Sequence, residues 1–209
     1  MAILKSGING PFSGKVGNVV GYELNGQTVI RSLPAIVKRA PSKLTLINRM
    51  RMKVVSQFLR HIKTPIAFGY KNIAPKGSRI GTFQSAQSYL LNNAIDFDAE
   101  HVPYVNPEKV LVFRGNLVPP LLINVERQDN KLHVEWNKEV CNGQPTVLVV
   151  LAYVIDTFCA LNEGGAHSTE GKMTWEHSLF SGDEHVHIYI GFYDMLHDEL
   201  SDSVYGGCV

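Results

Sequence analysis

The spacing of apolar positions changes along the chain, from a helical period in the first half to alternation in the second. Residues 43–61 and 81–95 carry apolar side chains three or four positions apart, which predicts two amphipathic helices. Ser42 is the predicted N-cap of the first helix, and Pro65 is expected to end it before a loop over residues 67–79. The predicted apolar stripe of the first helix consists of Leu44, Ile47, Met50, Val54, Phe58 and Ile62.

An extended arm and a β-hairpin are predicted before these helices. Glycines recur at spacings of three and four from Gly7 to Gly21, but glycine is costly inside a helix, so a turn-rich arm is the better interpretation. Residues 18–24 and 27–33 then flank Asn25-Gly26, a pair typical of a two-residue type I′ turn. We expect this arm to lie against a neighbouring subunit.

Strand signals dominate the rest of the chain. Residues 109–113 predict a strand that links the two halves. Asp129 and Asn130 are typical of a turn, and the alternation of Leu132 with Val134 indicates a strand with one buried face. The strands predicted at regular spacing cover residues 121–126, 132–136, 146–156, 172–179, 185–193 and 203–209. A second alternating set consists of Val186, Ile188, Ile190 and Phe192.

The order and spacing of these strands resemble a fibronectin type III module. Trp136 in "KLHVEW" occupies the place of the core tryptophan on the second strand of that module. The segment "LFSGDEHVHIYIGFYD" is similar to the corner that leads into the sixth strand, although His185 stands where the family has its corner tyrosine. The resemblance implies an antiparallel β-sandwich over residues 116–209. Residues 1–115 form the other predicted domain, with arm, hairpin, two helices and linking strand, so the predicted fold class is α+β.

A second resemblance covers the whole chain. The opening "GINGPFSGKVGNVVGYELNGQTVIRSLP", the basic helix after it and the closing "SDSVYGG" resemble an uncharacterised bacterial family, a domain of unknown function. This resemblance implies no activity. The glycine-rich hairpin followed by an Arg-rich helix is also similar, more weakly, to small virion-associated proteins of phages, which implies a role in assembly.

Charge divides the chain, although its formal net charge is only +1. Residues 1–92 hold 14 Lys and Arg against a single acid, Glu23, for a net charge of +13, and the remaining residues therefore carry −12. Such asymmetry indicates either an anionic partner or attraction between the two regions, within or between subunits.

The basic side chains of the first helix and its end are the predicted partner-binding residues: Arg49, Arg51, Lys53, Arg60 and Lys63. The expected function is that of a non-enzymatic structural, assembly or adhesive protein. Its arm, hairpin and basic helix would pack against the acidic sandwich of another subunit, in a homo-oligomer or a larger assembly. A nucleic-acid-binding protein that uses the basic helix over residues 43–63 is the alternative.

No motif for catalysis or for a cofactor is present, so we expect neither an enzyme nor a cofactor. The segment "GPFSGKV" has only three residues between Gly10 and Gly14, and Val16 stands where a P-loop needs Ser or Thr for magnesium. Neither G-x-S-x-G nor H-E-x-x-H occurs. His185 and His187 point to one face of a predicted strand and are weak metal candidates, while exposed surface histidines are the favoured interpretation.

Cysteine spacing and hydropathy give the remaining expectations. Cys141, Cys159 and Cys208 are widely spaced and include no C-x-x-C pair, so free thiols are expected. The longest apolar run, residues 147–155, is far shorter than the roughly 20 residues of a membrane-spanning helix. The first residues lack the apolar stretch of a signal peptide. The expected location is the cytoplasm, or a particle assembled there.

Overall fold

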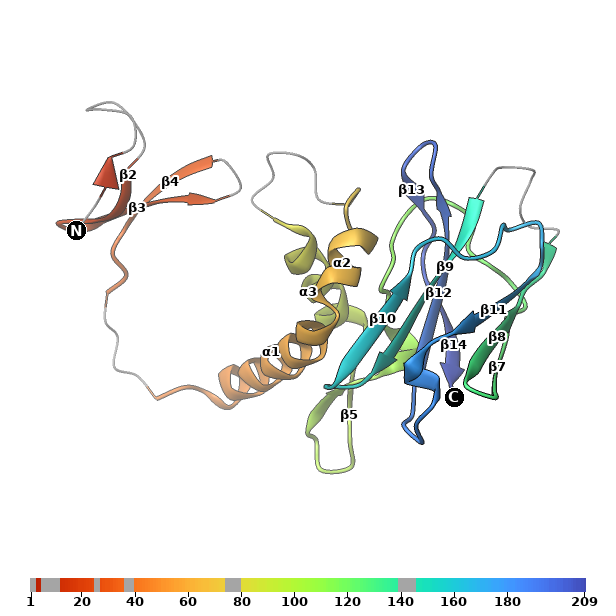
Figure 1. The fold of residues 1–209 in the computed structure, drawn as a ribbon. Coiled ribbons are helices and arrows are strands. Elements are labelled where there is room, and N and C mark those ends of the chain that lie inside the picture. The colour runs from red at the N-terminus through yellow and green to blue at the C-terminus, as the bar shows by residue number, and fades with distance from the viewer. Residues whose placement is uncertain (1–2, 5–11, 25–26, 36–39, 74–79, 139–145) are drawn as a thin grey trace.

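Helices cover one face of a central β-sheet, and a second sheet covers its other face (Figure 1). The computed structural model describes residues 3–4, 12–24, 27–35, 40–73, 80–138 and 146–209. A small N-terminal sheet stands apart from these layers (Figure 1). The α+β class predicted from the sequence is confirmed, and the fold is rich in strands.

The two packed sheets are antiparallel throughout. The central sheet has the order β10-β9-β12-β13, with β14 also paired to β12, and the second sheet has the order β11-β8-β7. The central strands are β9 (Thr146–Val154), β10 (Phe158–Asn162), β12 (His187–Asp194), β13 (Glu199–Leu200) and β14 (Val204–Cys208). The second sheet contains β7 (Asn124–Gln128), β8 (Lys131–Glu135) and β11 (Lys172–Glu176), and the 3-10 helix η3 (Ser178–Phe180) follows it. Strands β10 and β13 were not predicted.

Strand β9 is buried along its whole length, on both faces. Val149, Leu151 and Tyr153 belong to the core under the helices. Leu148 and Val150 belong to the core between the two sheets. Since successive side chains of a strand point to opposite faces, the unbroken apolar run of β9 is what a strand between two layers requires.

The core between the sheets is centred on Trp136, directly after β8. Its indole Nε1 donates a hydrogen bond of 2.8 Å to the Ser168 carbonyl oxygen, and its ring meets Phe192 edge-on. Leu132, Val134 and the alternating residues of β12 are buried in the same cluster, so the predicted inward faces are confirmed. Asp129 and Asn130 have positive φ angles between the paired ends of β7 and β8, which confirms the predicted turn.

Three helices lie against the other face of the central sheet. They are α1 (Lys43–His61), α2 (Lys63–Gly69) and α3 (Thr82–Asn93). The Ser42 hydroxyl accepts the Thr45 N–H, which confirms the predicted cap of α1. The prediction that Pro65 ends a helix and begins a loop was wrong. Pro65 lies in the first turn of α2, where the N–H that proline lacks has no partner inside a helix.

Residues 109–113 do not form the predicted strand. The 3-10 helix η1 (Pro107–Lys109) leads into an irregular segment in which Val112 and Phe113 are fully buried. The Val112 N–H donates to the Ser203 hydroxyl, and the Ser203 N–H donates to the Phe113 carbonyl. A side chain at Gly69 would overlap the Val112 carbonyl oxygen, so α2 packs directly on this backbone. The apolar run is buried in the core without a strand partner.

Two further sheets complete the described fold. The N-terminal sheet has the order β1 (Ile3–Leu4), β2 (Phe12–Val16), β3 (Val19–Leu24) and β4 (Gln27–Ser32). Leu24 pairs with Gln27, which confirms the predicted hairpin; its turn, Asn25-Gly26, lies outside the described residues. Strands β5 (Ile95–Phe97) and β6 (Pro103–Val105) form a hairpin that was not predicted.

The helices and the central sheet are joined by hydrogen bonds as well as by apolar contact. The buried Tyr153 hydroxyl donates to the Phe58 carbonyl of α1 (3.0 Å) and accepts the Asp156 N–H (3.1 Å). Burial raises the pKa of Tyr153 to about 12. The hydroxyl therefore stays neutral and forms hydrogen bonds with two backbone groups, one in α1 and one just after β9.

We predict that Tyr153→Phe lowers the free energy of unfolding by about 1–3 kcal/mol, because it leaves a buried carbonyl and an N–H without their partner. Urea denaturation followed by the fluorescence of the two tryptophans, Trp136 and Trp175, measures this change. Tyr104→Phe is the matched control, since Tyr104 is 45% exposed. An equal effect of the two substitutions would contradict the role of the Tyr153 hydroxyl.

Candidate protein-binding surface

The first half of α1 exposes its apolar side chains. Leu44 is 67% exposed and Met50 is 43% exposed, whereas Val55, Phe58 and Leu59 are buried. The predicted stripe is therefore covered only in the second half of the helix. The apolar side chains exposed in the first half are Leu44, Leu46, Ile47, Met50 and Met52. They point in several directions around the helix and alternate with polar and basic residues.

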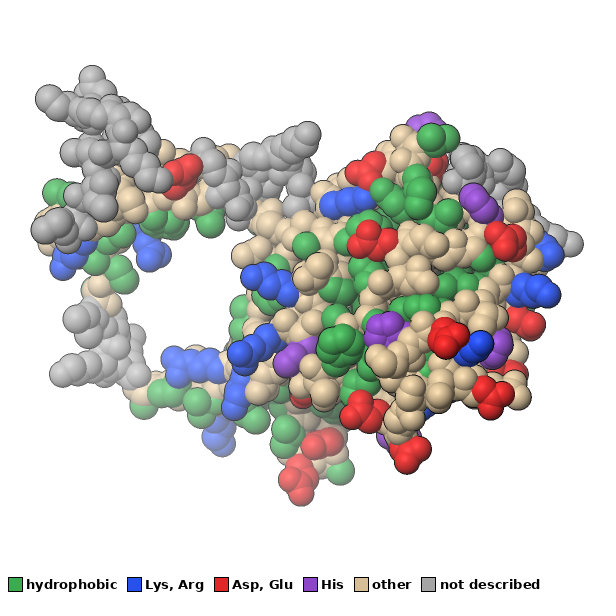
Figure 2. Space-filling model, viewed as in Figure 1, with side chains coloured by type: hydrophobic (Ala, Val, Ile, Leu, Met, Phe, Trp, Pro, Cys, Tyr) green, Lys and Arg blue, Asp and Glu red, His purple; other side chains and the backbone are tan. Residues whose placement is uncertain are grey.

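The N-terminal sheet also leaves its apolar side chains uncovered. Val16 and Ile30 are 57% and 60% exposed, and Figure 2 shows apolar side chains on the side of this sheet that is turned toward α1. Phe12 packs over Gly21, where any side chain would overlap its ring. Among residues 12–24, 27–35 and 40–54, no large apolar side chain is buried.

A third exposed apolar element is the β5–β6 hairpin, whose strand β6 contacts α1. Phe97, Val102 and Tyr104 are all at least 39% exposed. The Asp98 carboxylate accepts the N–H groups of Glu100 and Val102 and thereby fixes the loop. Glu100 itself is exposed and forms no ion pair within the described part of the chain.

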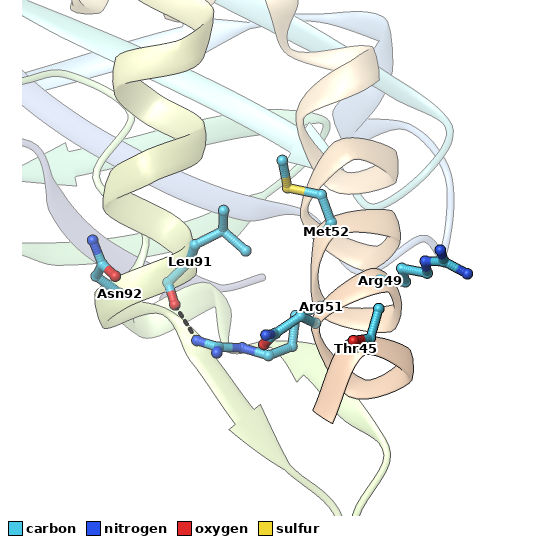
Figure 3. A pocket seen from close by; sticks show the side chains of 7 residues that line it. Thr45, Arg49, Arg51, Met52, Leu91 and Asn92 are labelled. Atoms are coloured by element: carbon cyan, nitrogen blue, oxygen red, sulfur yellow. Dashed lines mark hydrogen bonds between the residues drawn. The ribbon is translucent and has the colours of Figure 1, made fainter. Parts of the chain in front are cut away.

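A hollow of about 520 Å³ lies between α1 and the end of α3 (Figure 3). The Arg51 guanidinium crosses it and donates from Nη2 to the Leu91 carbonyl oxygen (2.5 Å). Its Nε is buried and has no hydrogen-bond acceptor among the described residues. Because a buried donor without an acceptor costs free energy, this hollow favours an incoming oxygen atom. The lining residues are Thr45, Asn48, Arg49, Arg51, Met52, Leu91 and Asn92.

The predicted basic residues do not all share one face. Arg49, Lys53 and Arg60 are spaced by four and seven positions, so they lie on one exposed side of α1. Arg51 is half-buried on the other side, over the hollow. Lys63 is exposed in the first turn of α2. No ion pair formed by these five residues exists within the described ranges.

Only one ion pair between described residues joins the basic residues 1–92 to the acidic remainder of the chain. The Lys71 ammonium contacts the Asp198 carboxylate and lies over the rings of Phe68 and Tyr193. Hydrogen bonding to Asp198 and Tyr193 raises the pKa of Lys71, against the effect of burial. The other ion pairs between described residues, Lys109–Asp96, Lys131–Glu176 and His197–Asp194, lie within the remainder of the chain.

The histidines proposed as weak metal candidates are not gathered into a site. His187 Nδ1 lies 2.8 Å from the Tyr205 hydroxyl, and His185 is exposed. No group of three or more His, Cys, Asp or Glu residues suited to a metal occurs in the described ranges. Cys159 and Cys208 are free thiols, as predicted, and Cys141 lies outside the described residues.

Sequence reasoning missed the β5–β6 hairpin and the inward position of Arg51. Only three residues form each strand of the hairpin, too few for a clear alternation, and its loop contains no glycine. The spacing of Arg51 was the available signal, because it lies four residues before the buried Val55 and eight before Leu59.

The fold and this surface define a strand-rich α+β protein whose N-terminal elements are left without a covering layer. The chain belongs to the family described as a family of unknown function (DUF6266), whose family model matches residues 11–207. The resemblance to an uncharacterised family is thus confirmed. Neither the comparison with curated proteins nor that with solved structures returned a match. In the described ranges, every helix is too short or too polar to cross a membrane.

Two histidines are predicted to have opposite effects on the pH dependence of stability. Burial and the neighbouring His185 lower the pKa of His187, so the unfolded chain binds the proton more readily. Stability that depends on neutral His187 is lost as the pH falls below about 6.5. The pKa of His197 is raised by its hydrogen bond and ion pair with Asp194, so its contribution is present at low pH and is lost as the pH rises.

Thermal unfolding of His187→Gln and His197→Gln between about pH 5 and 8 tests this assignment. Relative to the wild type, the first variant should gain stability toward acid pH and the second should lose it. The same trend in both variants would show that the assignment is wrong.

Proposed function

We propose that this chain is a non-enzymatic assembly protein whose N-terminal region binds another protein subunit. The observation that carries the proposal is the exposure of the apolar side chains before Val55. A strand-rich hairpin region and the first half of α1 leave these side chains in water. Sheets of this size are marginal unless one face packs against another layer. A partner that covers these elements supplies that layer.

The energetics favour such a partner. Burial of apolar surface stabilises by roughly 25 cal/mol per Å², so a contact that covers several of these side chains contributes several kcal/mol. Val16, Ile30 and Leu44 are each more than half exposed. In the isolated chain most of the surface of these side chains stays in contact with water.

The charge distribution supports the same role. The net charge of +13 on residues 1–92 and of −12 on the remainder gives each subunit one basic and one acidic region. Opposite regions of two subunits attract each other and fix their relative orientation. We place the assembly in the cytoplasm or in a particle formed there, and the likeness to virion-associated proteins favours a coat-forming or adhesive subunit.

We further propose that residues 116–209 form a fibronectin type III-like sandwich, attached to a basic region over residues 1–115. The strand order β11-β8-β7 facing β10-β9-β12-β14 supports this assignment, as does Trp136 between the sheets. The proposed boundary separates regions of different composition, although α1 and β9 contribute to one core.

Nucleic-acid binding is the second candidate. Arg49, Lys53 and Arg60 share one exposed side of α1 and form no ion pair in the described part of the chain, which is the arrangement that contacts phosphates. This candidate requires binding to duplex DNA at about 50 mM salt, with an affinity that falls linearly in log units with log salt. Failure of the protein to shift such a duplex would eliminate it.

The proposed function predicts a salt-sensitive oligomer. Light scattering should show a mass above the monomer at about 50 mM salt and a smaller mass at about 500 mM salt, because ions screen the attraction between the regions. Ile30→Asp should weaken assembly and leave unchanged the melting temperature of the unit formed by the helices and the two packed sheets.

Leu196→Asp is the matched control, since Leu196 is 76% exposed on the distant β12–β13 hairpin. A monomer at both salt concentrations and at every reachable protein concentration would refute the proposed function.

A further inference from the structure

The first half of α1 and the β5–β6 hairpin are exposed elements of opposite charge, and β6 contacts α1. We name the two together the helix–hairpin surface; it consists of residues 44–53 and 97–104. Contacts between α1 and the hairpin are made through β6. The basic side chains lie on the helix, and Asp98 and Glu100 lie at the tip of the hairpin.

We propose that a second copy of this chain occupies the helix–hairpin surface, with the hairpin of each copy packed against α1 of the other around a two-fold axis. The inference rests on the proposed function, that the protein assembles, and it adds the identity of the partner. A surface with a basic region and an acidic region can pair with a copy of itself, because a two-fold rotation brings the basic region of each copy onto the acidic region of the other.

Both halves of the surface offer apolar side chains for this contact. Ile47 and Met50 are at least 40% exposed on the helix, and Phe97 is 50% exposed on the hairpin. Val102 and Tyr104 extend the apolar area of the hairpin. Interfaces of stable dimers combine such apolar centres with a charged rim. The helix–hairpin surface has that composition.

The charges are available for contacts between copies. Arg49, Lys53 and Glu100 form no ion pair within the described part of the chain. Asp96 is excluded, because both of its carboxylate oxygens lie 2.7 Å from the Lys109 ammonium. Asp98 uses one oxygen for its own loop. Glu100 is thus the principal free acid of the hairpin, and it faces two free cations across the proposed axis.

The hollow beside Arg51 gives the contact a polar centre. Its Nε lacks an acceptor among the described residues, and Nη2 is held by the Leu91 carbonyl. An oxygen atom that reached Nε would complete its hydrogen bonding, which requires the hollow to open because Nε is buried. A carboxylate or a loop carbonyl of the partner's hairpin has the required chemistry.

The N-terminal sheet of a second copy fits this surface less well. Its described charges are Lys15, Glu23 and Arg31, so cations predominate there as they do on α1. Like charges across an interface reduce affinity. The β5–β6 hairpin of a second copy would instead bring the acidic side chains of Asp98 and Glu100 to the basic α1.

Charge reversal tests the proposal. Arg49→Glu with Lys53→Glu is the helix variant, and Glu100→Lys is the hairpin variant. Each places like charges on both sides of the contact, so each alone should weaken self-association at least about tenfold in sedimentation velocity at low salt. In an equimolar mixture both contacts of the mixed dimer again join opposite charges. The mixture should therefore associate with an affinity close to that of the wild type.

Glu163→Lys is the matched control, because it changes the net charge as Glu100→Lys does but lies outside the helix–hairpin surface, exposed directly after β10. It should weaken association much less than Glu100→Lys. Circular dichroism of each variant checks that it is folded. If both variants associate like the wild type, or if their mixture fails to associate, the helix–hairpin contact is wrong while the assembly function stands. A wild-type protein that never associates overturns the proposed function as well.

Discussion

Every residue of β9 is buried, and this single strand determines how the rest of the chain is arranged. Its two faces need two covering layers, because successive side chains point to opposite sides of the sheet. The sheet of β7, β8 and β11 covers one face, and the helices with the segment over residues 110–113 cover the other. The Tyr153 hydroxyl fixes α1 on that second face through the Phe58 carbonyl. The helices are therefore part of the same structural unit as the sheets.

The length of α1 then creates the surface that we assign to binding. The helix has 19 residues, but its buried residues begin only at Val55, so its first three turns extend beyond the layer that covers β9. The extension carries exposed apolar side chains together with Arg49 and Lys53, and the N-terminal sheet precedes it in the chain. Exposure of this apolar surface to water costs free energy in a monomer. Its burial in an assembly stabilises the assembly.

Much of this architecture follows from local patterns, and the rest depends on contacts between distant residues. Asn25-Gly26, the cap at Ser42 and the alternation around Trp136 act within a few residues, and the elements that they predict are present. Periodicity cannot distinguish a buried irregular segment from a strand, which explains the error at residues 109–113. Periodicity also assigned Leu44 and Phe58 to one apolar stripe, although only Phe58 is buried. The covering layer ends where β9 ends it, and β9 lies about 100 residues away in the sequence. The inward position of Arg51 was missed for the same reason, because the covered part of α1 depends on residues that are distant in the sequence.

Hydrogen exchange at several protein concentrations tests the central claim, that the elements before Val55 are stabilised by a partner subunit. The account predicts that amides of residues 12–24, 27–32 and 43–52 exchange rapidly in dilute protein and become protected as the concentration rises, while residues 55–61 remain protected throughout. Protection of residues 12–52 that is equal at all concentrations would contradict it, because those elements would then be stable in the single chain.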